Sequence, residues 1–196
     1  LEDGYKRQEH VYHDLKGKIA GILDDGPTDV GVESTIIDMS TDVPTILRPG
    51  AVTEEQLADV LGTVQGNKHK VGANETPKAP GMKYKHYAPD AQVEIVDHPS
   101  DFKAAVDWAG QQATKVGLMA TDDILAKLDV PANVETYSLG ADVAAASHLL
   151  FAGLRHFDLE TEVATIFTQG FSNDGLGAAY MNRLNKSAGG VHFTND

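Results

Sequence analysis

Residues 93–97, Val-Glu-Ile-Val-Asp, form a short run rich in apolar and β-branched side chains that is typical of a buried strand. Pro99 and Ser100 follow as a signal for the start of a helix. Apolar residues then recur at helical spacing, at Phe102, Val106, Ala109 and Ala113. A strand followed directly by an amphipathic helix predicts one unit of an alternating α/β fold.

The same alternation continues through the second half of the chain. We expect strands over residues 116–120, 134–137 and 164–168, and helices over residues 122–128, 142–157 and 176–188. Strand and helix thus alternate four times, which predicts a mostly parallel sheet covered by helices. Residues 92–196 are therefore predicted to form a Rossmann-like αβα domain.

The first 61 residues follow a different pattern. Their predicted elements are a short helix over residues 9–15, two β-rich runs over 34–38 and 44–47 that suit a hairpin, and a helix starting at Thr53, which has capping-box spacing to Gln56. About 60 residues is marginal for a domain that folds alone. These elements therefore either pack against the second half of the chain or are the end of a domain whose beginning is missing.

A segment without clear periodicity, residues 62–91, connects the two parts. It is rich in Gly, Asn, Lys and Pro, and between Thr76 and Pro89 it contains three lysines and no acidic residue. Connections of this length are usually functional loops or true linkers. We therefore predict a linker with a local positive charge.

The composition excludes several classes of protein. With 16 Lys and Arg against 29 Asp and Glu, the net charge is −13, so strong non-specific binding to nucleic acid is not expected. The absence of cysteine excludes disulfides, thiolate zinc sites and a cysteine nucleophile, and no histidine lies in a His-x-x-x-His pair with a carboxylate. No apolar run approaches the roughly 20 residues of a membrane-spanning helix. We expect a cytoplasmic protein with neither a metal site nor a membrane partner.

Three segments carry side chains suited to binding a ligand. They are residues 31–38 (Gly-Val-Glu-Ser-Thr-Ile-Ile-Asp), 47–50 (Leu-Arg-Pro-Gly) and 79–89 (Ala-Pro-Gly-Met-Lys-Tyr-Lys-His-Tyr-Ala-Pro). The hydroxyls of Ser34 and Thr35 suit a carboxylate, and Arg48 suits a phosphate. The third segment interleaves aromatic rings with positive charge, which suits a nucleotide base. Taken singly, each segment has a structural explanation, but together they predict an anionic nucleotide ligand.

A fourth segment, residues 175–180 (Gly-Leu-Gly-Ala-Ala-Tyr), is similar to a dinucleotide-binding fingerprint. Tyr180 replaces the third glycine of that fingerprint. A tight turn with close helix–sheet packing is the favoured interpretation. An NAD-binding dehydrogenase is the alternative that rests on this segment.

These segments resemble the later part of the long, two-domain threonylcarbamoyl-AMP synthases, in which a linker joins a YrdC-like domain to a C-terminal αβα domain. Residues 31–38 resemble the family's Gly-Val-Glu-Ser-Thr strand, residues 47–50 its Leu-Arg-Pro-Gly turn, and residues 79–89 its linker motif, with Ala79 in place of the usual Ser. Residues 175–184, ending in Met-Asn-Arg-Leu, resemble the end of its C-terminal domain. The resemblance implies that residues 1–61 are the C-terminal part of a YrdC-like domain, 62–91 the linker and 92–196 the C-terminal domain.

The resemblance also implies a reaction and a set of binding residues. L-Threonine, bicarbonate and ATP would give threonylcarbamoyl-AMP and pyrophosphate, with Mg²⁺ accompanying ATP, and a downstream transferase would pass the threonylcarbamoyl group to tRNA. Ser34 would contact threonine, and Arg48 and Tyr87 would contact ATP. Thr35, Lys83 and His86 are further candidates, and the chain is expected to contribute no catalytic residue and no metal ligand.

Two motifs of the family, Lys-x-Arg and Ser-Ala-Asn, are not found in these 196 residues. We therefore expect the C-terminal portion of a synthase, inactive or nearly so by itself. The alternative is a non-catalytic regulatory module that binds a nucleotide or RNA.

Overall fold

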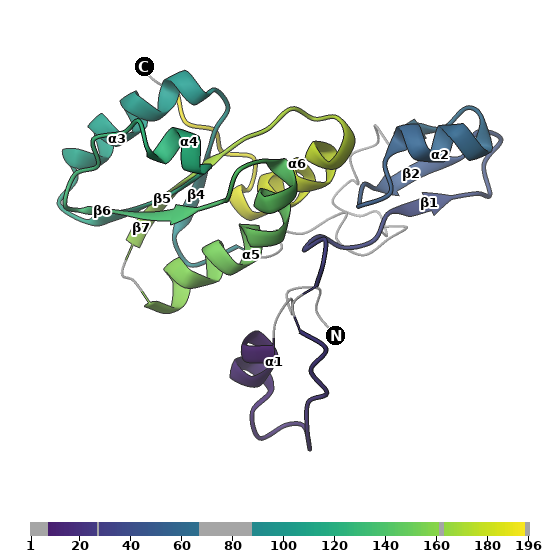
Figure 1. Cartoon of the computed structure of the whole chain (residues 1–196), viewed down its shortest axis with the longest axis horizontal. Helices are drawn as coiled ribbons and strands as arrows, with labels where there is room; N and C mark the ends of the chain where they lie inside the picture. Colours follow the sequence, from purple (N-terminus) through teal and green to yellow (C-terminus); the bar gives the residue numbers. More distant parts are fainter. Residues whose placement is uncertain (1–7, 27, 67–87, 161–162, 195–196) are drawn as a thin grey trace, which may run out of the picture.

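Two sheets organise the part of the chain that the structure, a computed structural model, describes: residues 8–26, 28–66, 88–160 and 163–194. One has three strands in the order β1-β2-β3, and the other has four in the order β4-β7-β5-β6. We call residues 8–66 the N-terminal part and residues 88–194 the C-terminal part. In Figure 1 the two sheets lie at opposite ends of the molecule, with one helix, α6, between them.

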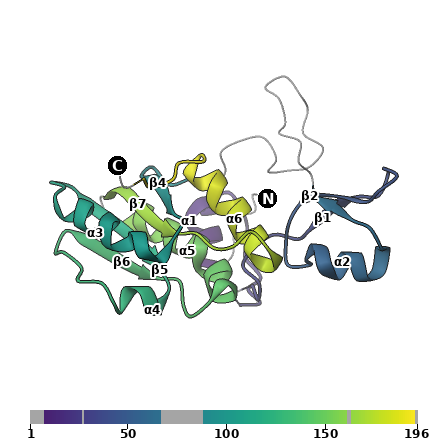
Figure 2. The same cartoon turned by 90° about the horizontal axis from the view of Figure 1, so that it is seen from above.

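The four-stranded sheet is entirely parallel. Its strands are β4 (Gln92–Val96), β5 (Lys115–Ala120), β6 (Val134–Ser138) and β7 (Val163–Gln169). The short 3-10 turn η1 (Pro99–Asp101), α3 (Phe102–Gly110) and α4 (Asp122–Leu125) lie on one face, and α5 (Val143–Glu160) and α6 (Gly175–Ala188) lie on the other (Figure 2). The predicted Rossmann-like αβα fold with a parallel sheet is confirmed.

The pleat of the strands explains why these segments are almost continuously apolar. Ile166 and Phe167 are neighbours in β7 and are both essentially fully buried, but they pack on opposite faces of the sheet. In β4, Ile95 joins the cluster under α5 and α6, whereas Val96 joins the cluster under α3 and α4. A parallel sheet that is covered on both faces requires apolar side chains in both directions.

The predicted helix over residues 122–128 is shorter in the structure. Helix α4 ends at Leu125, and the chain continues in tight turns in which the Lys127 amide donates to the Ile124 carbonyl and the Leu128 amide to the Leu125 carbonyl. Each of these bonds spans three residues, which is the pattern of a 3-10 turn and not of an α-helix. A helix is therefore correctly predicted at this place, but the α-helix is three residues shorter than predicted.

The N-terminal part contains a hairpin and two helices. Its elements are α1 (Gln8–Leu15), β1 (Ile36–Asp38), β2 (Thr45–Arg48), α2 (Glu54–Leu61) and β3 (Gln65–Gly66). The antiparallel pairing of β1 with β2 confirms the predicted hairpin. The capping box is confirmed as well, since the Gln56 amide donates to the Thr53 hydroxyl and the Thr53 amide to the Gln56 side chain.

Strand β3 lies inside the segment predicted to lack structure. It pairs in parallel with β2, and the Gln65 side chain donates to the Thr45 hydroxyl over 3.1 Å. Residues 67–87 lie outside the described residues, so the linker and the domain boundaries remain predictions.

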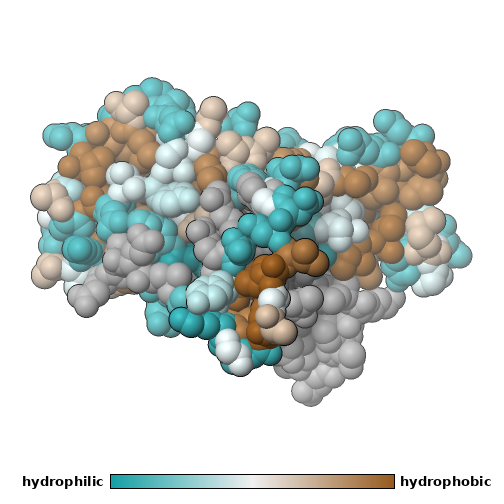
Figure 3. Space-filling model, turned by 60° about the horizontal axis from the view of Figure 1, so that its bottom comes forward, coloured by the Kyte–Doolittle hydropathy of each residue, from teal (hydrophilic) through white to brown (hydrophobic). Residues whose placement is uncertain are grey.

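The N-terminal part buries little apolar surface. Among its described residues, only Ile46 and Val64 are buried hydrophobic side chains, whereas Val60 is 82% exposed. Figure 3 shows apolar side chains on the surface over the part that carries β1, β2 and α2. The prediction that about 60 residues are too few for a closed core is borne out in this part of the structure. No helix among the described residues is both long and apolar enough to cross a membrane.

Candidate functional site

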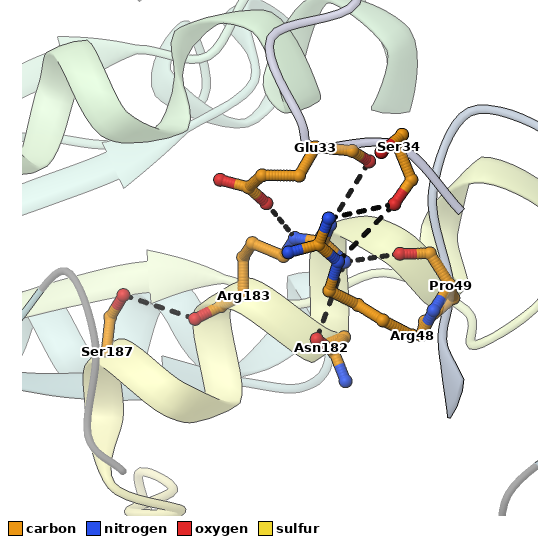
Figure 4. A network of polar contacts seen from close by, with 7 residues as sticks. All are labelled: Glu33, Ser34, Arg48, Pro49, Asn182, Arg183 and Ser187. Atoms are coloured by element: carbon orange, nitrogen blue, oxygen red, sulfur yellow. Dashed lines mark hydrogen bonds and ion pairs between the residues drawn. The ribbon is translucent and has the colours of Figure 1, made fainter. Parts of the chain in front are cut away.

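The side chain of Arg183 reaches from α6 into the N-terminal part. Its Nε donates to the Glu33 carboxylate over 2.5 Å, its Nη2 donates to the Glu33 carbonyl over 3.2 Å, and its Nη1 donates to the Pro49 carbonyl (Figure 4). The side chains of Arg183 and Glu33 are only 2% and 5% exposed. The ion pair is therefore buried and joins residues that are 150 positions apart.

Helix α6 is held in place by buried side chains that lie next to Arg183 on the helix. Tyr180 and Leu184 are completely buried in the core beneath α5 and α6, and the Tyr180 hydroxyl donates to the Gln169 carbonyl over 2.8 Å. A Cβ atom on Gly177 would lie 2.1 Å from the Ser172 carbonyl oxygen, so only glycine fits there. Residues 175–180 therefore serve close packing, as the favoured interpretation predicts.

The backbone of residues 31–35 lies in close contact with α5 on one side and with Gly50 on the other. A Cβ atom on Gly31, whose φ is +77°, would lie 2.3 Å from His148 Cα in α5. A Cβ atom on Gly50 would lie 2.3 Å from the Thr35 amide nitrogen and 2.6 Å from the Glu33 carbonyl oxygen. Both glycines are thus required by a close approach of two backbones.

The structure brings together Ser34, Thr35 and Arg48, three of the predicted binding residues. Arg48 is buried, and its Nε and Nη2 both donate to the Ser34 carbonyl, over 3.3 and 3.1 Å. Ser34 itself is exposed. The Thr35 hydroxyl donates to the Val52 carbonyl over 2.6 Å, which connects the residues just before β1 to the chain that follows Gly50. Strand β1 begins only at Ile36, so Ser34 and Thr35 precede the strand instead of opening it.

The remaining predicted binding residues, Lys83, His86 and Tyr87, lie outside the described residues. Sequence reasoning named no role for Glu33 or Arg183. One signal was present for Arg183: it lies three residues after Tyr180 and next to Leu184, on a helix side that is buried, where a charged residue needs a partner.

The site has a local excess of positive charge. Lys186 follows Arg183 by one turn of α6, and its pKa is lowered from 10.5 to about 8, mainly by burial. The nearby charges of Arg183 and Arg48 contribute to this lowering, and Glu33 opposes it. Three cations, Arg48, Arg183 and Lys186, thus lie together around the Glu33 carboxylate, in a chain whose net charge is −13. Such a site favours an anionic ligand.

A cavity of about 710 Å³ lies beside this cluster, between α6 and the connection from β2 to α2. Pro49, Gly50, Asn182 and Lys186 contribute to its wall, and so do three acidic residues, Glu54, Glu55 and Asp174. Its volume falls within the range of sites for small molecules and cofactors, roughly 300–1,000 Å³.

The pKa of Lys186 gives a testable dependence of stability on pH. Because the folded protein releases this proton near pH 8 and the unfolded chain near 10.5, the unfolded chain binds more protons between these values. The burial penalty is therefore fully present below pH 8 and is relieved as the pH rises towards 10.5. The variant K186Q should be more stable than the wild type at pH 7, and its advantage should shrink by pH 10.

Urea unfolding at several pH values measures this difference. K103Q is the matched control, since the Lys103 side chain is 79% exposed. A K186Q advantage that is absent at pH 7, or that does not change with pH, would contradict the assignment.

The chain matches two family models. Residues 52–189 match the one described as threonylcarbamoyl-AMP synthase, C-terminal domain, and residues 2–50 match one described as telomere recombination. Among curated proteins, the chain is 41% identical over 187 residues to the threonylcarbamoyl-AMP synthase of Bacillus subtilis, which covers 94% of the chain and 53% of that protein. It is 38% identical over 186 residues to the threonylcarbamoyl-AMP synthase of Pyrococcus abyssi, with 92% and 52% covered.

A solved structure has the same fold. The crystal structure of P. abyssi Sua5 complexed with L-threonine superposes with a TM-score of 0.81 at 34% identity, covering 96% of this chain and 56% of that one. The chain thus spans about half the length of the relatives it matches.

Proposed function

Because this chain belongs to the threonylcarbamoyl-AMP synthase family, we propose that its protein converts L-threonine, bicarbonate and ATP into threonylcarbamoyl-AMP and pyrophosphate. The observation that carries the proposal is the pair of hydrogen bonds from Arg48 to the Ser34 carbonyl. These bonds hold a candidate phosphate-binding residue beside a candidate threonine-binding residue, which such a condensation requires.

Each binding residue has a chemical task in this proposal. The exposed hydroxyl of Ser34 contacts threonine, and the guanidinium of Arg48 faces the phosphates of ATP. Tyr87 stacks on the nucleotide, and Thr35, Lys83 and His86 are further candidates. Magnesium arrives with ATP, because Mg²⁺ is held mainly by substrate phosphates and water.

The reaction needs two anions close together. The amine of threonine attacks the carbon of bicarbonate, and one bicarbonate oxygen leaves as water, which gives a carbamate. A carbamate oxygen then attacks the α-phosphorus of ATP and displaces pyrophosphate. No covalent bond to the protein is required. What the protein supplies is proximity and positive charge, and Arg48 lies within the cationic cluster described above.

The Lys-x-Arg and Ser-Ala-Asn motifs of the family are not in these 196 residues. We propose that turnover needs them, that the 196 residues by themselves are nearly inactive, and that a downstream transferase passes the product to tRNA. Residues 1–61, 62–91 and 92–196 then correspond to the end of the YrdC-like domain, the linker and the C-terminal domain.

The test is pyrophosphate release from ATP by the full-length protein and by residues 1–196 alone. We expect release by the full-length protein only when threonine and bicarbonate are both present, and little release by the 196 residues. R48K should lower the full-length rate by roughly 10²-fold, because lysine cannot replace a planar guanidinium at a site that positions phosphate. The surface variant K103Q should leave the rate unchanged. Release that is independent of threonine would refute the synthase proposal.

A further inference from the structure

We propose that Arg183 is a positioning residue for the reaction, so that helix α6 of the C-terminal part sets the geometry of Ser34 and Arg48. This inference rests on the proposed function. It assigns a task to a part of the chain that carries none of the candidate substrate-binding residues of the described structure.

The contacts of Arg183 fall directly beside the two candidate binding residues. Glu33, which takes two of its hydrogen bonds, precedes Ser34 in the chain, and Pro49, which takes a third, follows Arg48. One guanidinium therefore holds the backbone of both segments at once (Figure 4). A contact that served only to connect the N-terminal part to the C-terminal part would not need to involve the segments that carry Ser34 and Arg48.

The segments are also joined to each other, so that a displacement of one moves the other. Arg48 donates twice to the Ser34 carbonyl, and Gly50 packs against the backbone of residues 33–35. On its other side, the same backbone lies against α5 at Gly31. Arg183 thus acts on a unit with little freedom to relax, which is the arrangement that a precise site requires.

The planar fork of arginine suits this task. Its three nitrogens donate to a carboxylate and to two backbone carbonyls that lie in different segments, and this fixes direction as well as distance. A lysine would keep the charge and lose most of these bonds. A displacement of about 1 Å between two reacting groups can cost about 10²-fold in rate, so the loss should appear in kcat.

The test compares E33Q and R183K in the full-length protein. The matched control is E135Q, which removes a carboxylate that lies within hydrogen-bond distance of His156, 2.8 Å away and inside the C-terminal part. At temperatures well below unfolding, we expect kcat for threonine-dependent pyrophosphate release to fall roughly 10-fold in E33Q and roughly 10²-fold in R183K, and to stay within twofold in E135Q. Since saturating substrate does not repair a misplaced group, the loss should persist at high threonine and ATP. Unchanged kcat in folded E33Q and R183K would overturn the inference.

A second measurement separates this inference from the proposed function. If the wild type releases no pyrophosphate in response to threonine, the proposed function is wrong, and hydrogen exchange of the backbone amides of residues 31–35, Arg48 and Gly50 decides the positioning role. Faster exchange there in E33Q than in E135Q supports ordering by Arg183, and equal exchange overturns it. E33Q serves this purpose even if R183K does not fold.

Discussion

Replacing Gly50 with alanine should destabilise the protein by about 3 kcal/mol or more, because the new methyl group has no free space. It would lie 2.3 Å from the Thr35 nitrogen and 2.6 Å from both the Glu33 oxygen and the Ser34 carbonyl carbon. All three are backbone atoms, so no side-chain rotation relieves the overlap. The segment that carries Ser34 must move away, and the pair of bonds from Arg48 must lengthen.

Denaturant unfolding measures the loss, and Gly21→Ala is the matched control, since nothing lies within 4 Å of a Cβ atom at that position. We expect G21A to differ from the wild type by less than about 0.5 kcal/mol. If G50A and G21A were equally stable, the close approach of the two backbones would not exist in solution.

The second large effect is expected for Arg183→Met. This change keeps much of the apolar stem but leaves the Glu33 carboxylate buried without its cation, and two backbone carbonyls lose a donor. Removal of one partner from a buried ion pair typically costs about 3–5 kcal/mol. By contrast, K103M breaks the exposed pair of Lys103 with Asp107 and should cost less than about 1 kcal/mol.

A double-mutant cycle gives the sharper result. In R183M/E33Q the buried group is neutral, so part of the loss should be recovered, with a coupling of about 1–3 kcal/mol between the two positions. Unfolding free energies of the four proteins provide the measurement. Additive effects would mean that Glu33 is not charged or not paired with Arg183 in solution.

Local patterns were sufficient for most of the C-terminal part. The apolar run at 93–97 predicted β4, because a sheet covered on both faces leaves a continuous apolar trace in the sequence. The helical spacing of Phe102, Val106 and Ala109 predicted α3, but the helix cap expected at Pro99 and Ser100 is not formed: the 3-10 turn η1 occupies residues 99–101 and α3 begins at Phe102 without a side-chain cap. The pair Thr53 and Gln56 likewise predicted the start of α2. Each of these signals is contained within a few neighbouring residues.

Features that depend on distant residues were not predicted. Strand β3 has only two residues, too few for a pattern, and it exists because β2 offers an edge to pair with. The pairing of Glu33 with Arg183 joins two motifs that the sequence had singled out separately, but no periodicity relates positions 150 residues apart. The lowered pKa of Lys186 follows from that same approach of α6 to the N-terminal part.

The order of the strands has a consequence for the biosynthesis of the protein. Strand β7 lies between β4 and β5, so the centre of the parallel sheet stays vacant until the ribosome has translated residues 163–169. Helix α6 follows β7, and Arg183 is added 150 residues after Glu33, roughly 8–30 s later at about 5–20 residues per second. During most of that interval the nascent chain contains Ser34 and Arg48 but lacks Arg183, whose guanidinium connects the adjacent residues Glu33 and Pro49. The contacts of Arg183 with Glu33 and Pro49 can therefore form only after the central strand β7 has been translated.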